Sequence, residues 1–450
     1  MGQYSRLTTE PIPSLIRSIS IPASIGFFFN TMFNVVDTFF AGVISTQALA
    51  ALSLSFPVFF IILSLGSGIS TGTTALIATA LGEGDLPKAR MFAIQGIAFG
   101  VLLSMVVTAI GIAASPQLFS LLGATGEYLG MCLVYMNTIF LGSVFFILNF
   151  MLNSILNAQG DTRSFRNFLI VGCFLNIILD PWFIYGGLGV PAMGVRGVAV
   201  ATVVIELIGN LYLGYKVSLT DLACGRCFSE AIPRMNAFRE IAQQGFPTSL
   251  NSITVGVGIF VITYFISIFG KEAVAAYGVA TRVEQIMLLP TIGLNIATVT
   301  IVAQNNGARL FDRIFETVRT ALAYGGIFMA FGTIALLVFA GPLMGLFTAD
   351  RQVIAIGTFY LRIAAFILYA YVILYVSVAA LQGVKRPVYG LIIGIVRQIA
   401  LPLMVFPFFA ELLGMGIAGI WWGIFAINWG AALITFLYSR AYLKRVLISS

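Results

Sequence analysis

Two aspartates, an asparagine and a threonine lie inside otherwise apolar segments, and their side chains could bind a small cation. Asp37 belongs to the motif NVVDT, Asn176 and Asp180 belong to the motif NIILDP, and Thr202 lies in a later apolar segment. Because residues four apart share one face of a helix, Asn176 and Asp180 should point the same way. Carboxylate, amide and hydroxyl oxygens suit a proton or Na⁺ and include no soft ligand for a transition metal. A carboxyl group buried beside a second one can exchange a proton near physiological pH.

Helices that cross a lipid bilayer must position these residues. Only 9% of the 450 residues are charged, 59% are hydrophobic, and the mean hydropathy is +1.01. A soluble protein usually carries about a quarter of its residues as charged ones, so lipid must solvate most of this exterior. The apolar runs are long and continuous, which favours membrane-spanning helices over the alternating strands of a barrel.

Apolar runs bounded by Gly, Pro or charged residues predict twelve spans. The first six are expected near 14–40, 48–80, 91–113, 128–157, 165–188 and 194–216. The second six are expected near 238–268, 273–305, 314–340, 352–381, 387–410 and 414–439.

The positions of Lys and Arg predict the orientation of these spans. Eighteen basic residues fall on the side of the termini, and only Arg196, Lys271 and Arg351 fall on the other. Cytoplasmic loops carry the excess of positive charge, so we expect both termini to be cytoplasmic. With this orientation, four polar side chains fall in the outer half of their spans: Asp37, Asn176, Asp180 and Thr202. There they can share one polar chamber.

The two sets of six spans resemble each other. Pro22 and Pro247 are 225 residues apart, and other small or polar residues recur at offsets of 222 to 226, including Gln159 with Gln382 and Gly194 with Gly416. Such ordered recurrence indicates an internal repeat. We expect a first lobe at 1–216, a linker at 217–237 and a second lobe at 238–450.

A unit with an even number of spans re-enters the membrane in the same orientation, so the two lobes should be parallel repeats. The predicted fold is an all-α membrane protein with twelve transmembrane helices in two pseudo-symmetric six-helix lobes. Two such lobes can enclose a central cavity that opens to either side in turn, which is the geometry of a secondary transporter.

The two acids have an alternative, structural interpretation. They could pair with the arginines that remain inside the predicted spans, Arg282, Arg362 and Arg397. The repeat does not favour this alternative, because Asp37 corresponds to Ile262 and Asp180 to Leu403 in the second lobe. An acid pair confined to one of two similar lobes indicates a specialised site.

Other polar residues inside the spans could be structural or could line a cavity. Asn149, Asn153 and Asn157 form a stripe for which hydrogen bonding between helices is the default. Arg282 and Glu284 are two residues apart and should face different partners. Glu206 and Arg397 could be structural pairing groups. Further residues that we expect along a substrate cavity are Asn30, Phe33 and Asn34.

Several function classes fit poorly. The net charge of +7 is scattered over loops, which does not favour nucleic acid binding. The sequence has no histidine, no phosphate-binding glycine motif and no nucleophile motif, so an enzyme or ATPase is not expected. Cys224 and Cys227 form a lone C-x-x-C, which we interpret as a reduced thiol pair rather than a metal site. A passive channel is not expected either, because it would need symmetric pore-lining charges, which two lobes of unequal polarity do not offer.

The chain resembles the multidrug and toxic compound extrusion (MATE) family. The resemblance rests on FNVVDT in the first span, LNIILDP in the fifth, AVAAYG opening the eighth, and QGD after the fourth. The stretch RVE at 282–284 looks most like the DinF-like branch. The resemblance to the MATE family covers nearly the whole chain.

That resemblance implies a V-shaped pair of lobes that exports organic cations or other amphipathic compounds in exchange for H⁺ or Na⁺. It implies that Asp37, Asn176, Asp180 and Thr202 form the site that responds to the cation, and that protonation of Asp37 is linked to bending of the first helix at Pro22. The sequence departs from the family pattern at Phe33, where an aromatic hydroxyl is common, and near Thr254, where another branch carries an acid.

We therefore predict a monomeric antiporter of the cytoplasmic membrane, with lipid around it, small-molecule drugs as cargo, no cofactor and no nucleic acid partner. Substrate contacts are expected from Asn153, Asn30, Phe33, Asn34, Glu284 and Arg282. A flippase for lipid-linked oligosaccharides of similar two-lobe architecture is the alternative, since Arg282, Arg362 and Arg397 could contact phosphate.

Overall fold

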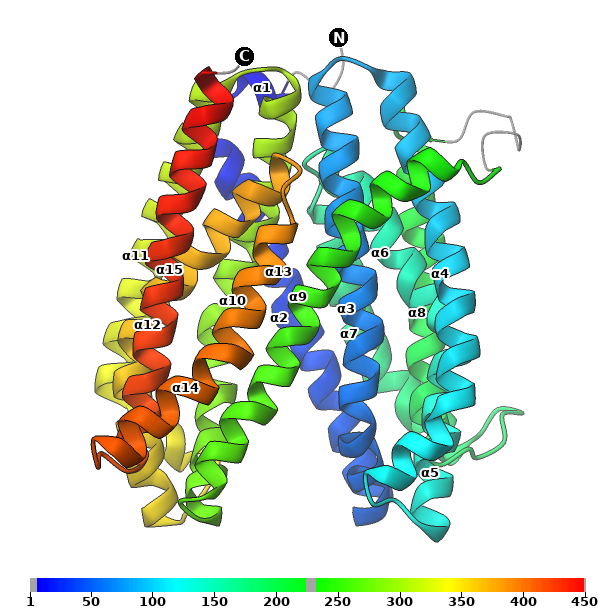
Figure 1. The fold of residues 1–450 in the computed structure, drawn as a ribbon. Helices are drawn as coiled ribbons and strands as arrows, with labels where there is room; N and C mark the ends of the chain where they lie inside the picture. The colour runs from blue at the N-terminus through cyan, green and yellow to red at the C-terminus, as the bar shows by residue number, and fades with distance from the viewer. Residues whose placement is uncertain (1–5, 224–231, 449–450) are drawn as a thin grey trace. The chain divides into compact units, whose positions relative to one another are not determined.

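The computed structural model describes residues 6–223 and 232–448, and the described chain is almost entirely helical (Figure 1). Cys224 and Cys227, with much of the predicted linker, lie outside the described residues. The first half contains α1 (Arg6–Thr9), α2 (Ile12–Ile44), α3 (Thr46–Gly82), α4 (Leu86–Leu121), α5 (Gly126–Leu141), α6 (Ser143–Ala158), α7 (Arg163–Tyr185) and α8 (Val195–Ser218). The second half contains α9 (Met235–Ser267), α10 (Lys271–Gly307), α11 (Phe311–Gly345), α12 (Arg351–Gly383), α13 (Val388–Ile395), α14 (Leu401–Pro407) and α15 (Ile417–Ile448).

These helices confirm the twelve predicted spans. Within the described ranges, eleven helical segments are long and apolar enough to cross a membrane. The twelfth span is the pair α5 and α6, which bend by 43° at a short break between Leu141 and Ser143. The predicted eleventh span is less regular than a single helix, because π-helical turns at Val396–Ala400 and Phe408–Leu412 interrupt it.

Local sequence explains several helix ends. Ser45 begins α3 by accepting a hydrogen bond from the backbone of Ala48, and Asp85 caps α4 by accepting one from Lys88. Asp350 caps α12 in the same way, through the backbone of Gln352 and Val353. Each cap satisfies an amide that has no partner inside its helix. The spans therefore begin where short polar residues precede long apolar runs.

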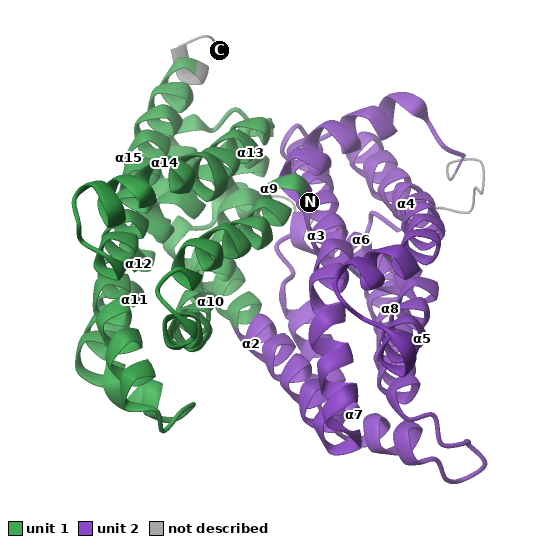
Figure 2. Ribbon diagram, turned by 60° about the horizontal axis from the view of Figure 1, so that its bottom comes forward, with its two compact units in different colours: residues 1–24, 250–450 green, residues 25–249 purple. Residues whose placement is uncertain are grey.

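The chain divides into two compact units, residues 1–24 with 250–450 and residues 25–249 (Figure 2). This division differs from the predicted lobes, because the start of α2 belongs with the second half and the start of α9 belongs with the first. Both α2 and α9 are continuous helices of 33 residues, so each one passes from one unit into the other.

Close backbone contacts explain why the start of α2 and the start of α9 each belong to the unit formed mainly by the other half of the chain. In the unit of residues 1–24 and 250–450, Gly293 of α10 lies so close to Ser20 and Ser24 of α2 that a side chain would collide with them. In the other unit, Gly68 and Gly72 of α3 lie equally close to Ser249 and Gly245 of α9. Gly68 and Gly293 are 225 residues apart, as are Ser24 and Ser249. The repeat is therefore present in the packing as well as in the sequence.

The N-terminal segment is tied to the unit of residues 1–24 and 250–450 by polar contacts. Asn305 donates a hydrogen bond of 3.1 Å to the carbonyl of Leu7, and Arg313 donates one of 2.7 Å to the carbonyl of Glu10. Arg313 also donates to the side chain of Asn305 at 2.9 Å. These bonds explain how the start of α2 is held beside α10.

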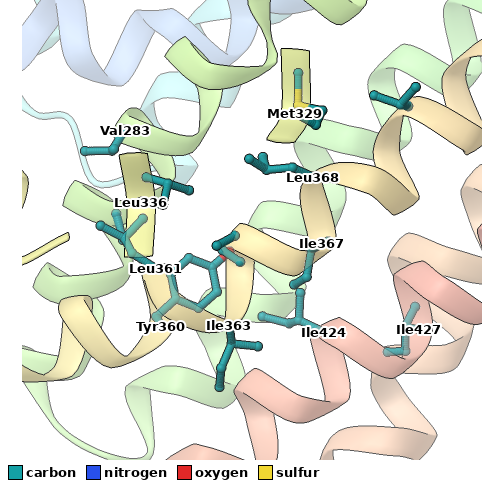
Figure 3. Packing of buried hydrophobic residues seen from close by; sticks show 14 of the residues in the cluster. Val283, Met329, Leu336, Tyr360, Leu361, Ile363, Ile367, Leu368, Ile424 and Ile427 are labelled. Carbon is teal, nitrogen blue, oxygen red and sulfur yellow. The ribbon is translucent and has the colours of Figure 1, made fainter. Parts of the chain in front are cut away.

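An apolar core fills the same unit (Figure 3). Met329 and Leu336 of α11, Leu361 and Leu368 of α12, and Ile424 of α15 are among its buried members. Large apolar side chains also cover the outside: Phe331 of α11 is exposed, for example. Apolar groups on both the inside and the outside of a helix are expected where lipid replaces water.

The contact of Gly72 can be tested against a matched glycine. In Gly72→Ala the new methyl group would lie 2.6 Å from the backbone nitrogen of Gly245, so we expect a loss of about 1–3 kcal/mol in stability. Gly130 of α5 has open space around it, and Gly130→Ala should change stability by at most about 1 kcal/mol. Thermal unfolding of the purified variants measures both; equal melting temperatures would contradict the close-packing argument.

Candidate functional site

Asp37 lies at the centre of a polar cluster formed by α2, α7 and α8. Its side chain is 7% exposed. The amide nitrogen of Asn176 on α7 donates a hydrogen bond of 2.8 Å to Oδ1 of Asp37, and the hydroxyl of Thr202 on α8 donates a longer one of 3.4 Å to Oδ2. Side chains of α7 and α8, which lie 139 and 165 residues further along the chain than Asp37, thus hold its carboxyl group.

Asp180 completes the cluster beside Asp37 and Asn176, but no hydrogen bond to its carboxyl group has ordinary geometry. It is fully buried one helical turn beyond Asn176, and its carboxyl group interacts directly with that of Asp37. Neither Asp180 oxygen accepts a hydrogen bond, and the amide oxygen of Asn176 has no partner either. Buried polar atoms normally have partners, so these three oxygens need an explanation.

A small cation fits this arrangement. Two carboxyl groups in contact repel each other when both are ionised, and a proton on one of them would make a hydrogen bond to the other. Na⁺ would instead find its ligands among Asp37, Asp180, the Asn176 amide oxygen and the Thr202 hydroxyl, because hard cations bind oxygen. The donor set has the chemistry for either ion.

The alternative in which arginines neutralise the acids is not what the structure shows. Over residues 6–223 and 232–448, no salt bridge to Asp37 or Asp180 is present. Arg397 instead donates a hydrogen bond of 2.7 Å to Asn428, and its guanidinium lies over the ring of Tyr371. Both acids are therefore free of a fixed counter-ion within the described chain.

Sequence reasoning missed Tyr135 as a member of the cluster. This buried tyrosine on α5 lies near enough to interact electrostatically with both Asp37 and Asp180. It supplies an aromatic hydroxyl from a different helix, whereas the sequence analysis noted only the phenylalanine at position 33. A tyrosine among apolar residues in the fourth span was the available signal, but nothing in its spacing linked it to Asp37.

The face of α2 that carries Asp37 also carries three predicted cavity residues, Asn30, Phe33 and Asn34. All three are half-buried, and Asn34 donates to the backbone carbonyl of Asn30 at 2.8 Å. Spacings of three, four and seven residues place them on one side of the helix with Asp37. Pro22 lies inside the same continuous helix, two residues before the boundary between the compact units.

The asparagine stripe of α6 divides between two roles. Asn149 donates to Glu206 of α8, at 2.6 Å to its carboxylate and 2.9 Å to its backbone, so this pair links two helices. Asn153 and Asn157 are also buried, and the amide oxygen of Asn153 has no partner. The amide oxygen of Asn149 has no partner either, so the described contacts separate the two residues only by the bonds that Asn149 donates to Glu206.

Glu284 and Arg282 belong to the other unit. Glu284 is buried and accepts a hydrogen bond of 2.8 Å from Tyr360, whose ring packs against Tyr277 and Trp421. Arg282 is exposed, so the two residues face different surroundings, as their spacing predicted. Asp37 belongs to the unit of residues 25–249, whereas Glu284 belongs to the unit of residues 1–24 and 250–450.

Comparison with known proteins identifies the family and the fold. The MatE family profile matches the chain twice, at residues 22–182 and 247–407. Both the starts and the ends of these matches are 225 residues apart, which lies within the offsets of 222 to 226 found in the sequence. Most of each half therefore matches the same family unit.

Relatives match over most of their length. An FAD transporter of Shewanella oneidensis is 30% identical over 88% of this chain and 88% of its own. The probable multidrug resistance protein NorM of Thermotoga maritima is 26% identical over 98% and 96%. The multidrug export protein MepA of Staphylococcus aureus is 28% identical over 79% and 78%.

Solved structures share the fold. A MATE structure in the bent conformation has a TM-score of 0.92 and 25% identity, covering 100% of this chain and 99% of that one. A transporter of the MOP superfamily from Pyrococcus furiosus, described as having a binding pocket of reverse polarity, has a TM-score of 0.91 and 26% identity over 98% of each chain. With twelve apolar spans, an internal repeat and these matches, the chain belongs to the MatE family of multidrug and toxic compound extrusion transporters.

Proposed function

We propose that this protein is an ion-coupled antiporter that exports organic cations or other amphipathic compounds in exchange for H⁺ or Na⁺. The observation that carries the proposal is the buried pair Asp37 and Asp180, which has hydrogen-bond donors for one acid only and no basic partner among the described residues. Such a pair can bind and release a cation, whereas an acid locked to an arginine cannot do so readily.

In the proposed cycle the two acids are the sensor of the coupling ion. When the ion is absent, the charge of the pair favours a cationic or amphipathic cargo in the unit of residues 25–249. When a proton or Na⁺ enters, it cancels part of that charge and changes the hydrogen bonds of Asp37. The ion can drive export only if it binds one arrangement of the protein more tightly than the other.

Asn30, Phe33, Asn34 and Asn153 are proposed to contact cargo, because they lie on the Asp37 face of α2 or carry an unpartnered amide oxygen. For Arg282 and Glu284 a cargo contact remains a prediction from the sequence. The orientation with both termini in the cytoplasm, the location in the cytoplasmic membrane and the monomeric state are also part of the proposal. It includes no enzymatic step and no cofactor.

The class of cargo needs a direct comparison, since the relatives differ in the compounds after which they are named. NorM and MepA are named for multidrug resistance or export, and the Shewanella relative is named for FAD, an amphipathic anion. The acid pair favours cationic cargo by charge. None of these names favours the flippase alternative, so transport assays should include a cationic dye and a flavin dinucleotide.

Replacing Asp37 by Asn should abolish coupled transport. The amide keeps the size of the side chain but can neither ionise nor share a proton with Asp180. In proteoliposomes with separately imposed proton and sodium gradients, we expect the wild type to move an organic cation with one gradient or both. Asp37→Asn should reduce that rate by at least about 100-fold, toward the rate of empty vesicles.

Asp312→Asn is the matched control, because Asp312 lies in the first turn of α11 and outside the cluster. It should transport at the wild-type rate. Full activity of Asp37→Asn at equal protein content would refute the role of Asp37, and gradient-independent movement by the wild type would refute antiport itself.

The two donors to Asp37 should differ in importance. Asn176 makes the shorter bond, at 2.8 Å, while the Thr202 hydroxyl is 3.4 Å away and also donates to the carbonyl of Val198 at 3.0 Å. A hydrogen bond to a charged group contributes about 1.5–3 kcal/mol, so Asn176→Ala should slow transport by about tenfold or more and Thr202→Val by less than about threefold. Initial rates of dye uptake would show the order, and the reverse order would contradict this geometry.

Pro22 is proposed as a hinge in α2. A proline inside a helix removes one backbone hydrogen bond and permits a bend, and Pro22 lies two residues before the boundary between the units. Pro22→Ala should therefore lower the transport rate by about tenfold or more while leaving thermal stability unchanged or higher. Pro116→Ala in α4 serves as the control. If both variants transported at the wild-type rate, the hinge would be excluded.

A further inference from the structure

A groove on the unit of residues 25–249 has none of the four polar-cluster residues in its lining. It runs between α7 and α8 and encloses about 440 Å³. Its walls are mostly apolar, formed by Phe168, Ile170, Val171, Gly172, Leu175, Ile205 and Ile208, and one end is polar, formed by Asn167 and Tyr212. The distance from Asn167 to Leu175 along the helix is about 12 Å, which is part of the length of an acyl chain.

The groove opens to the surface. Val171 is 54% exposed and Ile208 is 39% exposed, so its apolar floor is available from outside. Gly172 helps to make the hollow, because it carries no side chain at a point where α8 contributes Ile205. In a protein whose exterior faces lipid, such a groove can hold a hydrocarbon chain.

Two cations lie at its polar end. The guanidinium of Arg166 donates two hydrogen bonds to the side-chain oxygen of Asn167, at 2.7 Å and 3.1 Å. The ammonium of Lys216 lies 5.7 Å from the centre of the Tyr212 ring. Each cation thus contacts a residue that lines the groove, and the positive charges gather at the end where α7 begins and α8 finishes.

Within residues 6–223 and 232–448, neither cation forms a salt bridge with an acid. The salt bridges of the described residues involve Arg6, Lys88 and Lys271. Like charges that gather at one place without counter-ions repel each other, and an anion between them removes that cost. The polar end of the groove can therefore attract a negatively charged group.

In the second half of the repeat, the positions equivalent to Arg166 and Lys216 carry aromatic rings. By the offset of 223 that relates Gln159 to Gln382, Arg166 corresponds to Tyr389. By the offset of 222 that relates Gly194 to Gly416, Lys216 corresponds to Tyr438. The rings of Tyr389 and Tyr438 stack 4.1 Å apart. Equivalent positions are therefore neighbours in space, and only the first half places two cations there.

We propose that the groove between α7 and α8 binds an anionic phospholipid, with an acyl chain along the apolar walls and the phosphate at Arg166 and Lys216. Under the orientation proposed above, this end of the groove lies at the cytoplasmic surface, where anionic headgroups attract basic residues. The lipid would pack α7 against α8, the two helices that carry Asn176, Asp180 and Thr202. Its binding does not depend on which cargo is moved.

Lipid retention by the intact purified protein tests the proposal. The protein is placed in nanodiscs with equal amounts of phosphatidylglycerol and phosphatidylcholine, and native mass spectrometry counts the lipids that stay bound. We expect the wild type to retain phosphatidylglycerol at least about tenfold more than phosphatidylcholine. The double variant Arg166→Gln with Lys216→Gln should lower this preference by about tenfold or more.

Filling the groove is an independent test. Ile208→Trp places a large side chain in the hollow and should lower retention of both lipids by at least about fivefold. Leu211→Trp is the matched control on α8, because Leu211 is 68% exposed and does not line the groove. Arg319→Gln with Arg440→Gln, on α11 and α15, controls for the loss of two charges.

The outcomes separate clearly. Loss of preference in the charge variant and loss of retention in Ile208→Trp, with both controls unchanged, would support the site. Equal retention of the two lipids by the wild type, or an equal loss in the controls, would overturn it. None of these readouts involves transport, so failure of the lipid site and failure of the antiporter proposal would be distinguishable.

Discussion

The cost of burying a carboxyl group among apolar helices shapes this molecule more than any other interaction. Asp37 and Asp180 lie in the interior of one compact unit, where water cannot solvate them, and the described chain supplies no arginine to pair with them. Around Asp37, α7 and α8 supply the donors Asn176 and Thr202. Asp180 has no hydrogen bond of ordinary geometry, and this imbalance is the basis of the proposed response to a small cation.

The two halves share one backbone plan but have different polar chemistry. Gly68 with Ser249 and Gly293 with Ser24 are equivalent contacts, and they tie the starts of α9 and α2 into the opposite unit. The first half carries the acid pair. The second half carries Glu284, which accepts from Tyr360, and Arg397, which lies in a π-helical turn and donates to Asn428. A repeated scaffold has thus been specialised through a few buried side chains.

Much of the fold was predictable because membrane spans leave a strong one-dimensional signal. Long apolar runs and the distribution of Lys and Arg predicted twelve spans, and even the bent pair α5 and α6 was expected as one span. The joining of Asp37 with Asn176 was predictable from depth along the spans. Tyr135 was not predicted, because an isolated tyrosine gives no periodic signal and its role depends on how α5 packs.

By itself, the sequence determined the helical membrane class, the repeat and the identity of the acid pair, since apolar length, repeated spacing and rare intramembrane charges are all properties of the chain in one dimension. Only the tertiary structure decided that the starts of α2 and α9 belong to the unit of the other half, and that Asn149 donates a hydrogen bond to Glu206. It also decided that Asp180 has no hydrogen bond of ordinary geometry. These facts depend on contacts between helices distant in the chain. Close backbone approach and the satisfaction of buried polar atoms are settled only when those helices pack.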